Sequence, residues 1–267
     1  SVFVEPGRIR VAGVTGVYGA MQLTDGKAVV SFLEAGPWLE LEITGTMAGA
    51  HLLDFLTKTM KTEQLIRVLA GVRDVEGTAQ PTFRLVGPLN QPDGVTFAGG
   101  TIVAQSISLS HTALPERLTG LQGRFILDNG STRFEQVTGH LGDAEVQIEG
   151  TLTGGGSGQF QNFGLRARGG AMPMARLASL PAIAPGTFEG TVSADMTLSG
   201  SIATPHLRGL VVLDEAKLIV PGLGGKPIGA PAAIEFEGEA AKTSGMAMRR
   251  LEVVLPSVRI PVKGRVL

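Results

Sequence analysis

Four histidines are the residues of this sequence best suited to metal binding or acid–base catalysis. They are His51, His111, His140 and His206, and no two of them form an H-x-x-x-H pair. A metal site needs several nitrogen, oxygen or sulfur ligands that converge at ~2 Å, whereas these histidines are scattered over separate segments. The sequence therefore predicts histidines on the surface and no metal or cofactor site.

Neither a nucleophile nor a phosphate-binding loop stands out. The chain has no cysteine and no G-x-S-x-G motif, so no thiol or hydroxyl is singled out for nucleophilic attack. The glycine-rich run at residues 154–158 lacks the Lys-Ser/Thr pair and the helix of a phosphate loop, and we interpret it as a flexible hairpin tip. The Asn-x-Ser sequence at Asn129 is explained fully by a hairpin turn. These segments give no indication of covalent catalysis.

Acidic residues recur in pairs, but their pattern does not suit acid–base catalysis. Glutamates stand two positions apart, as Glu40 and Glu42 do, on the same side of an alternating segment. Acid–base catalysis needs two carboxyls whose environments separate their pKa values, and two equivalent solvent-facing glutamates share one environment. Trp38 and Tyr18 are single residues of their types, so packing on a strand is favoured over stacking on a sugar. We therefore predict that the chain is not an enzyme.

The composition excludes further classes of function. The 267 residues carry 23 basic and 24 acidic side chains, so the formal net charge of −1 gives no electrostatic basis for nucleic-acid binding. Glycine contributes 38 residues without a G-X-Y period, which excludes collagen. No apolar run is long enough for a membrane-spanning helix, and the chain opens without a signal-peptide pattern. Because it stops inside an alternating pattern at residues 262–267, we expect a piece of a longer protein.

Apolar and polar residues alternate with period two through most of the chain, as at residues 39–44. Such alternation is typical of antiparallel strands with one apolar face and one solvated face. Asp25-Gly26 and Asn129-Gly130 suit two-residue hairpin turns, because these residue types tolerate a positive φ. The pattern therefore predicts strands that are joined by short turns.

Helical spacing is confined to short stretches. Apolar residues recur every three or four positions at residues 49–71, and a shorter echo occupies residues 172–180 before a proline. The predicted fold class is mainly β, with an elongated, curled antiparallel sheet of repeats and short helical connectors.

The sequence contains a long internal repeat. Gly77 matches Gly190 and Gly87 matches Gly200, in both cases 113 positions later, and the residues around them are similar. A second set of similar segments covers residues 36–45, 142–150 and 256–264. Repeats that contact their neighbours need no single central core, which suits a chain with 5% aromatic residues.

The repeat divides the chain into three parts. We predict the C-terminal part of a first unit with its helical connector at residues 1–74, a complete unit at 75–187, and a truncated third unit at 188–267. Each unit supplies strands with an aliphatic face, and no second class of strands is evident to cover it. Because a monomer rarely leaves a large apolar surface bare, this face is either closed into a core or used for binding.

The repeat also resembles a known family. The segment LSGSIATPHLRG at residues 198–209 has the cadence L-x-G-x-(I/L)-x-x-P-x-(L/F)-x-G, and residues 77–87 and 142–152 are similar to other parts of the same repeat. These segments resemble the AsmA-like superfamily, which includes the YhdP- and TamB-type bridge-like lipid transfer proteins of the Gram-negative envelope. The resemblance covers nearly all of the chain and depends on this cadence rather than on a catalytic motif.

The resemblance implies a periplasmic conduit that carries phospholipid acyl chains in an apolar groove between the inner and outer membranes. Contacts with both membranes would lie in parts absent from this chain, and an inner-membrane anchor belongs to the full-length protein. The candidate groove residues are Leu39, Leu41, Ile43, Phe83, Leu85, Ile107, Leu109, Phe125, Leu127, Val146, Ile148, Met196, Leu198, Ile234 and Phe236. Two alternatives are a closed structural β-solenoid or sandwich, and an envelope chaperone that binds outer-membrane proteins by strand-edge pairing.

Overall fold

The structure is a computed structural model that describes residues 1–59, 70–91, 94–112, 114, 116–128, 130–154, 160–173, 187–201, 204–220, 224–241 and 245–261. The described residues are mainly β, with a single α-helix, and their antiparallel sheet is open rather than closed. The expected fold class, a mainly β antiparallel sheet with a helical connector, is therefore confirmed. A closed solenoid or sandwich core is not formed by the described strands.

The chain divides by packing into two compact units. The N-terminal unit comprises Ser1–Val137 and Thr153–Phe160, and the C-terminal unit comprises Thr138–Leu152 and Gln161–Leu267. Compact packing and sequence repetition are different properties, so the three repeat ranges at 1–74, 75–187 and 188–267 stay a prediction.

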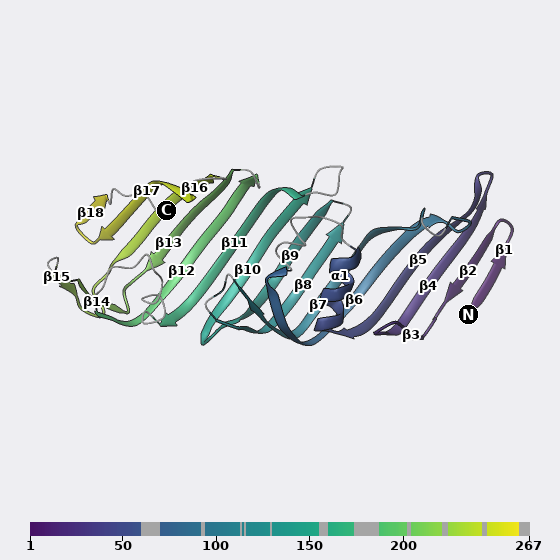
Figure 1. Ribbon diagram of the computed structural model, residues 1–267, viewed down its shortest axis with the longest axis horizontal. Helices are drawn as coiled ribbons and strands as arrows, with labels where there is room; N and C mark the ends of the chain where they lie inside the picture. The colour runs from purple at the N-terminus through teal and green to yellow at the C-terminus, as the bar shows by residue number, and fades with distance from the viewer. Residues whose placement is uncertain are drawn as a thin grey trace. The chain divides into compact units, whose positions relative to one another are not determined.

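The N-terminal unit is a sheet of successive antiparallel strands, which lie side by side in chain order in Figure 1. Its strands are β1 (Val2–Glu5), β2 (Arg8–Ala12), β3 (Gly16–Tyr18), β4 (Met21–Leu33), β5 (Gly36–Ala48), β6 (Val72–Pro88), β7 (Thr96–His111), β8 (Leu118–Asp128) and the first part of β9 (Ser131–Leu141). Each of the longer strands pairs with the next, so alternating residues of one strand share a face with alternating residues of its neighbours.

One of the two hairpin turns expected from the sequence is wrong. Asp25 and Gly26 lie inside β4, beside a register shift between Leu23 and Asp25 in the pairing of β4 with β5. The Val14 N–H donates to the Gly26 carbonyl oxygen at 3.1 Å, so Gly26 continues the sheet instead of reversing the chain. A β-bulge favours the same residue types as a hairpin turn. The Asp25-Gly26 sequence therefore does not distinguish between the two structures.

The second expected turn holds. Strand β8 ends at Asp128 and β9 begins at Ser131, and Gly130 has a φ of 93°. Asn129 itself lies outside the described residues, as do residues 155–159 of the glycine-rich hairpin tip between β10 and β11.

The helix α1 (Gly49–Thr59) follows β5 directly and lies on the apolar face of the N-terminal unit, over the strands around β6 (Figure 1). This confirms the first part of the helix expected at residues 49–71, while residues 60–69 lie outside the described residues. Leu52 of α1 is buried with Phe83, Ile102 and Ile107 of the sheet. The core of this unit is therefore formed between the helix and one face of the sheet.

The C-terminal unit is a second run of antiparallel strands. They are the last part of β9, β10 (Ala144–Gly154), β11 (Phe160–Pro173), β12 (Thr187–Ser201), β13 (Pro205–Val212), β14 (Ala216–Val220), β15 (Gly224–Lys226), β16 (Ala233–Ala241), β17 (Gly245–Leu255) and β18 (Val258–Pro261). Strand β12 pairs with β14 over its first residues and with β13 over the rest, so a small β14–β15 branch leaves one end of the sheet.

A compact core forms near this branch. Val192, Leu213, Ala216 and Ala232 are buried there. The prediction of a shorter helix at residues 172–180 is wrong at its start, because Met172 belongs to strand β11. Residues 174–180 lie outside the described residues. Met172 instead packs against the buried cluster beside the branch, so a tertiary contact outweighs local spacing.

Two glycines that the repeat relates have the same backbone conformation. Gly77 has a φ of 92° and Gly190 a φ of 86°. A Cβ at Gly77 would overlap the carbonyl oxygen of Ser106, and one at Gly190 would overlap that of Glu215. Glycine is needed at both positions, because a side chain has neither the space nor the conformation.

We therefore expect Gly190→Ala to destabilise the C-terminal unit by about 1–3 kcal/mol or more, since a strained backbone conformation alone costs this much. Urea unfolding measures the loss. Gly170→Ala is the matched control, because its φ lies outside the positive range and its Cβ would meet nothing within 4 Å. Equal stability of the two variants would contradict this interpretation.

Candidate functional site

The strand registers place all predicted groove residues of the N-terminal unit on one face of the sheet. Ile43 is the Cα partner of Phe83 and Leu41 that of Leu85, and directly opposed residues point to the same side. Alternation brings Leu39 onto this side. The other predicted groove residues of this unit surround Phe83. Ile107 and Leu127 belong to the same buried cluster, and Leu109 and Phe125 pack against it.

These residues differ in how much of each side chain is exposed to solvent. Phe83 is 1% exposed, and Ile107 and Leu127 are also buried, so these three form core beneath and beside α1. Leu39, Leu41, Ile43, Leu85, Leu109 and Phe125 are half-buried. In this unit the apolar face is thus partly a closed core and partly an accessible strip.

The predicted groove residues of the C-terminal unit also share one face. Leu198 is the Cα partner of both Leu165 and Leu207, and Met196, two residues before it, is 37% exposed. Across the neighbouring strands, Ile234 opposes Val211.

Phe236 joins this face over a glycine. A Cβ at Gly209 would overlap the Phe236 ring, so the ring lies across the bare backbone of β13. Val146 is on the same side, because its Cγ1 is 3.9 Å from where a Cβ of Gly169 would stand. Ile148 follows Val146 by two residues and so points the same way. No helix covers this face among the described residues of the unit.

The opposite face of the C-terminal unit is charged. Arg166 forms an ion pair with Asp195, and Arg168 contacts the same carboxylate at 3.4 Å. A second network joins Arg250 and Arg259 with Glu252 and Glu235. One surface of the sheet is therefore aliphatic and the other is lined by ion pairs, which is an amphipathic sheet.

These ion-pair networks lower the pKa values of two carboxyl groups. The hydrogen bond from Arg166 lowers the pKa of Asp195, and Arg168 adds to the effect. The hydrogen bond from Arg250 likewise lowers the pKa of Glu252. Both carboxyl groups are half-buried and their arginine partners are exposed, so each pair is screened by solvent and contributes little to stability.

A pH dependence follows from the lowered pKa of Asp195. A group whose pKa is lower in the folded state stabilises the fold fully above its unfolded pKa of about 3.9 and loses this effect as the pH falls through the folded pKa. We expect Asp195→Asn to cost less than about 1 kcal/mol at pH 7, and we expect this cost to shrink as the pH falls below about 3.9. Urea unfolding at several pH values tests this, and a cost that does not decrease with falling pH would contradict it.

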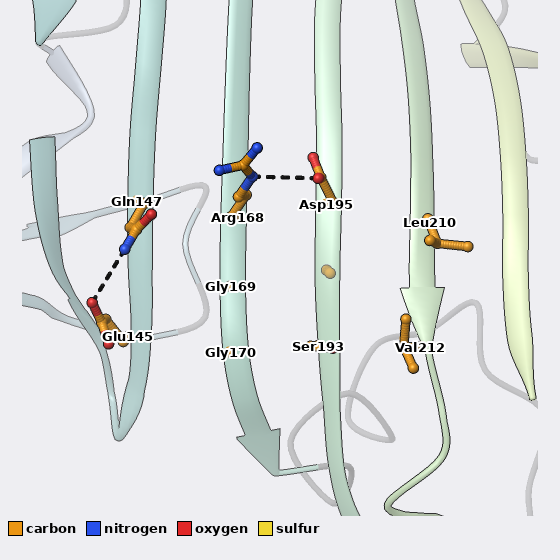
Figure 2. Close-up of a pocket in the computed structure, with 10 residues that line it drawn as sticks. Glu145, Gln147, Arg168, Gly169, Gly170, Ser193, Asp195, Leu210 and Val212 are labelled. Atoms are coloured by element: carbon orange, nitrogen blue, oxygen red, sulfur yellow. Dashed lines mark hydrogen bonds and ion pairs between the residues drawn. The ribbon is translucent and has the colours of Figure 1, made fainter. Parts of the chain in front are cut away.

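A shallow hollow of about 310 Å³ lies on the charged side of the C-terminal unit. Figure 2 shows Arg168 joined to Asp195 along one side and Glu145 joined to Gln147 along another, with Leu210 and Val212 on the neighbouring strand. Gly170 leaves space in its wall. The polar groups around the hollow already have partners, because Arg168 is paired with Asp195 and Gln147 donates a hydrogen bond to Glu145.

Several residues of the apolar face are not among those predicted from the sequence. Phe55 of α1 and Phe97 of β7 both pack on Phe83, with ring centroids 4.6 Å and 5.9 Å away. Leu121 is the Cα partner of Ile107. The apolar side of α1 was visible as a helical pattern, but local sequence does not indicate which face of a sheet a helix will cover.

The described residues contain no group of three or more histidine, aspartate or glutamate side chains that could hold a metal ion. His206 lies 3.4 Å from Glu239 as part of the charged face. Among the described helices, none is long and apolar enough to cross a membrane. Comparisons with protein-family models, with curated proteins and with solved structures found no match to this chain.

Proposed function

We propose that this chain is part of a lipid conduit in which acyl chains lie on the apolar face of the sheet while head groups stay in water. Exposure of an acyl chain to water costs about 0.8 kcal/mol per CH₂ group. A continuous aliphatic surface lowers that cost along the whole path. A position in the periplasm, between the inner and the outer membrane, is part of this proposal and is supported by the resemblance of the sequence to the AsmA-like superfamily.

One observation carries the proposal: residues from successive strands of the C-terminal unit form one aliphatic face that no described helix covers. Met196, Leu198 and Phe236 lie outside the buried core of that unit, which is confined to the end near β14. An apolar face of this kind is usually a binding surface. Because it is rich in flexible aliphatic side chains, it suits acyl chains better than a ligand of fixed shape.

The test is to purify the chain without detergent and to identify bound lipid by mass spectrometry. We expect phospholipid in the preparation, and we expect the lipid-free protein to extract a fluorescent phospholipid from vesicles. A monomer that carries no phospholipid and extracts none would refute the conduit.

A second candidate is a chaperone that pairs with strands of outer-membrane proteins, and the open sheet favours it, because strand edges are templates for pairing. The two functions are distinguished by Ile148→Asp. A charge on the apolar face of the C-terminal unit lowers lipid binding at that unit, whereas edge pairing uses the backbone and continues as long as the variant folds.

A further inference from the structure

The apolar face of the N-terminal unit already has an occupant, the helix α1. Leu52 is 7% exposed, and the Phe55 ring stacks on Phe83 with a centroid distance of 4.6 Å and an interplanar angle of 17°. Leu56 packs against the same cluster. The helix therefore covers the kind of surface that, in the proposed function, receives an acyl chain.

The sheet under α1 is complete without the helix. Strand β5 pairs with β6 from Trp38 to Ala48, and β6 pairs with β7 along most of its length. The contacts of Leu52, Phe55 and Leu56 with the sheet are apolar. Removal of the helix would break no strand pairing and would expose an apolar surface, which is the change that a bound acyl chain compensates.

The helix in turn depends on the sheet. Its described part, Gly49–Thr59, has no acidic residue in its first turn, and most helical stability in proteins comes from the packing of an apolar helix face rather than from helix propensity. Its helical state is thus maintained by the apolar surface beneath it. A ligand that takes over this surface would compete directly with the helix.

We propose that α1 is a displaceable lid over the acyl-chain site of the N-terminal unit. It shields the apolar face from water when no lipid is present and leaves the sheet when an acyl chain binds. This inference rests on the proposed function and adds a regulatory step to it. The two units then differ, because no described helix closes the face of the C-terminal unit.

A covalent lock on α1 tests the lid. A photoreactive benzoylphenylalanine replaces Phe55, and irradiation without lipid ties α1 to the sheet near Phe83, which peptide mass spectrometry verifies. Phospholipid bound per chain is then measured by native mass spectrometry before and after irradiation. We expect the locked protein to bind about half as much phospholipid or less, since only the C-terminal unit stays open. Placing the probe at His51, an exposed residue of the same helix, controls for irradiation.

A reversible lock gives a second measurement. A Cβ at Gly49 would stand 2.8 Å from Cγ1 of Val75, so Gly49→Cys with Val75→Cys brings two thiols within the reach of a disulfide. The chain has no other cysteine. Reduction should restore the phospholipid bound. Unchanged lipid binding in both locked proteins would refute the lid alone, whereas no binding in locked and unlocked protein would refute the proposed function as well.

Discussion

Leu198→Asp will lower phospholipid binding by the C-terminal unit roughly tenfold or more, because an ionised carboxylate against an acyl chain must lose its hydration. Leu198 lies at the centre of the open apolar face, with Leu165 and Leu207 directly opposite on the two neighbouring strands. The loss is measured as extraction of a fluorescent phospholipid from vesicles by protein whose α1 has been cross-linked to the sheet, so that only the C-terminal unit is open. Since Leu198 is only half-buried, the fold is expected to survive the substitution, and circular dichroism checks this.

Thr197→Asp is the matched control. Thr197 is the next residue of the same strand, is exposed, and opposes Arg166 and Arg208 on the charged face. A carboxylate there meets cations and stays in water, so lipid binding should be unchanged. If both variants lose binding equally, the lipid does not distinguish the two faces, and the apolar face is not the site.

Phe83→Ala will destabilise the N-terminal unit by about 3–5 kcal/mol, the usual cost of deleting a buried aromatic ring. Phe83 contacts Phe55 of the helix and Phe97 of β7, so its loss leaves a cavity between α1 and the sheet. Urea unfolding followed by circular dichroism measures the change, with the slope of the transition compared between variants.

Phe32→Ala provides the comparison for that measurement. It deletes the same ring at a position that is 56% exposed, where surface substitutions usually change stability by no more than about 0.5 kcal/mol. A Phe83→Ala variant as stable as Phe32→Ala would show that α1 does not depend on the sheet face described here. The inference about the lid would then also fail.

The faces of the sheet could be predicted from the sequence, because period-two alternation is a local property of extended backbone. Leu41 and Leu85, far apart in the chain, were assigned to the same apolar surface, and the register makes them direct partners. Register itself is not local, and bulges change it. Ser106, with a φ of 55°, lies at one such irregularity in β7, and nothing about a serine in an alternating run indicates it.

The position of the helix could not be predicted in the same way. The helical pattern that begins at residue 49 was correct, but whether its apolar side faces a neighbouring strand, a partner or a ligand depends on tertiary packing. Asp25-Gly26 failed for a related reason, because a bulge and a turn need the same backbone freedom. The ion pair between Arg166 and Asp195 likewise joins two strands whose pairing is not encoded in either segment.

Photo-cross-linking from neighbouring positions of β12 tests the central claim most directly. Benzoylphenylalanine is placed at Met196, on the apolar face, or at Thr197, on the charged face, and each protein is irradiated with phospholipid vesicles. We expect a phospholipid adduct, identified by mass spectrometry on the acyl chain, from position 196 and little or none from position 197. Equal adducts at both positions, or none from position 196 in a folded protein, would contradict the assignment of the apolar face as the lipid path.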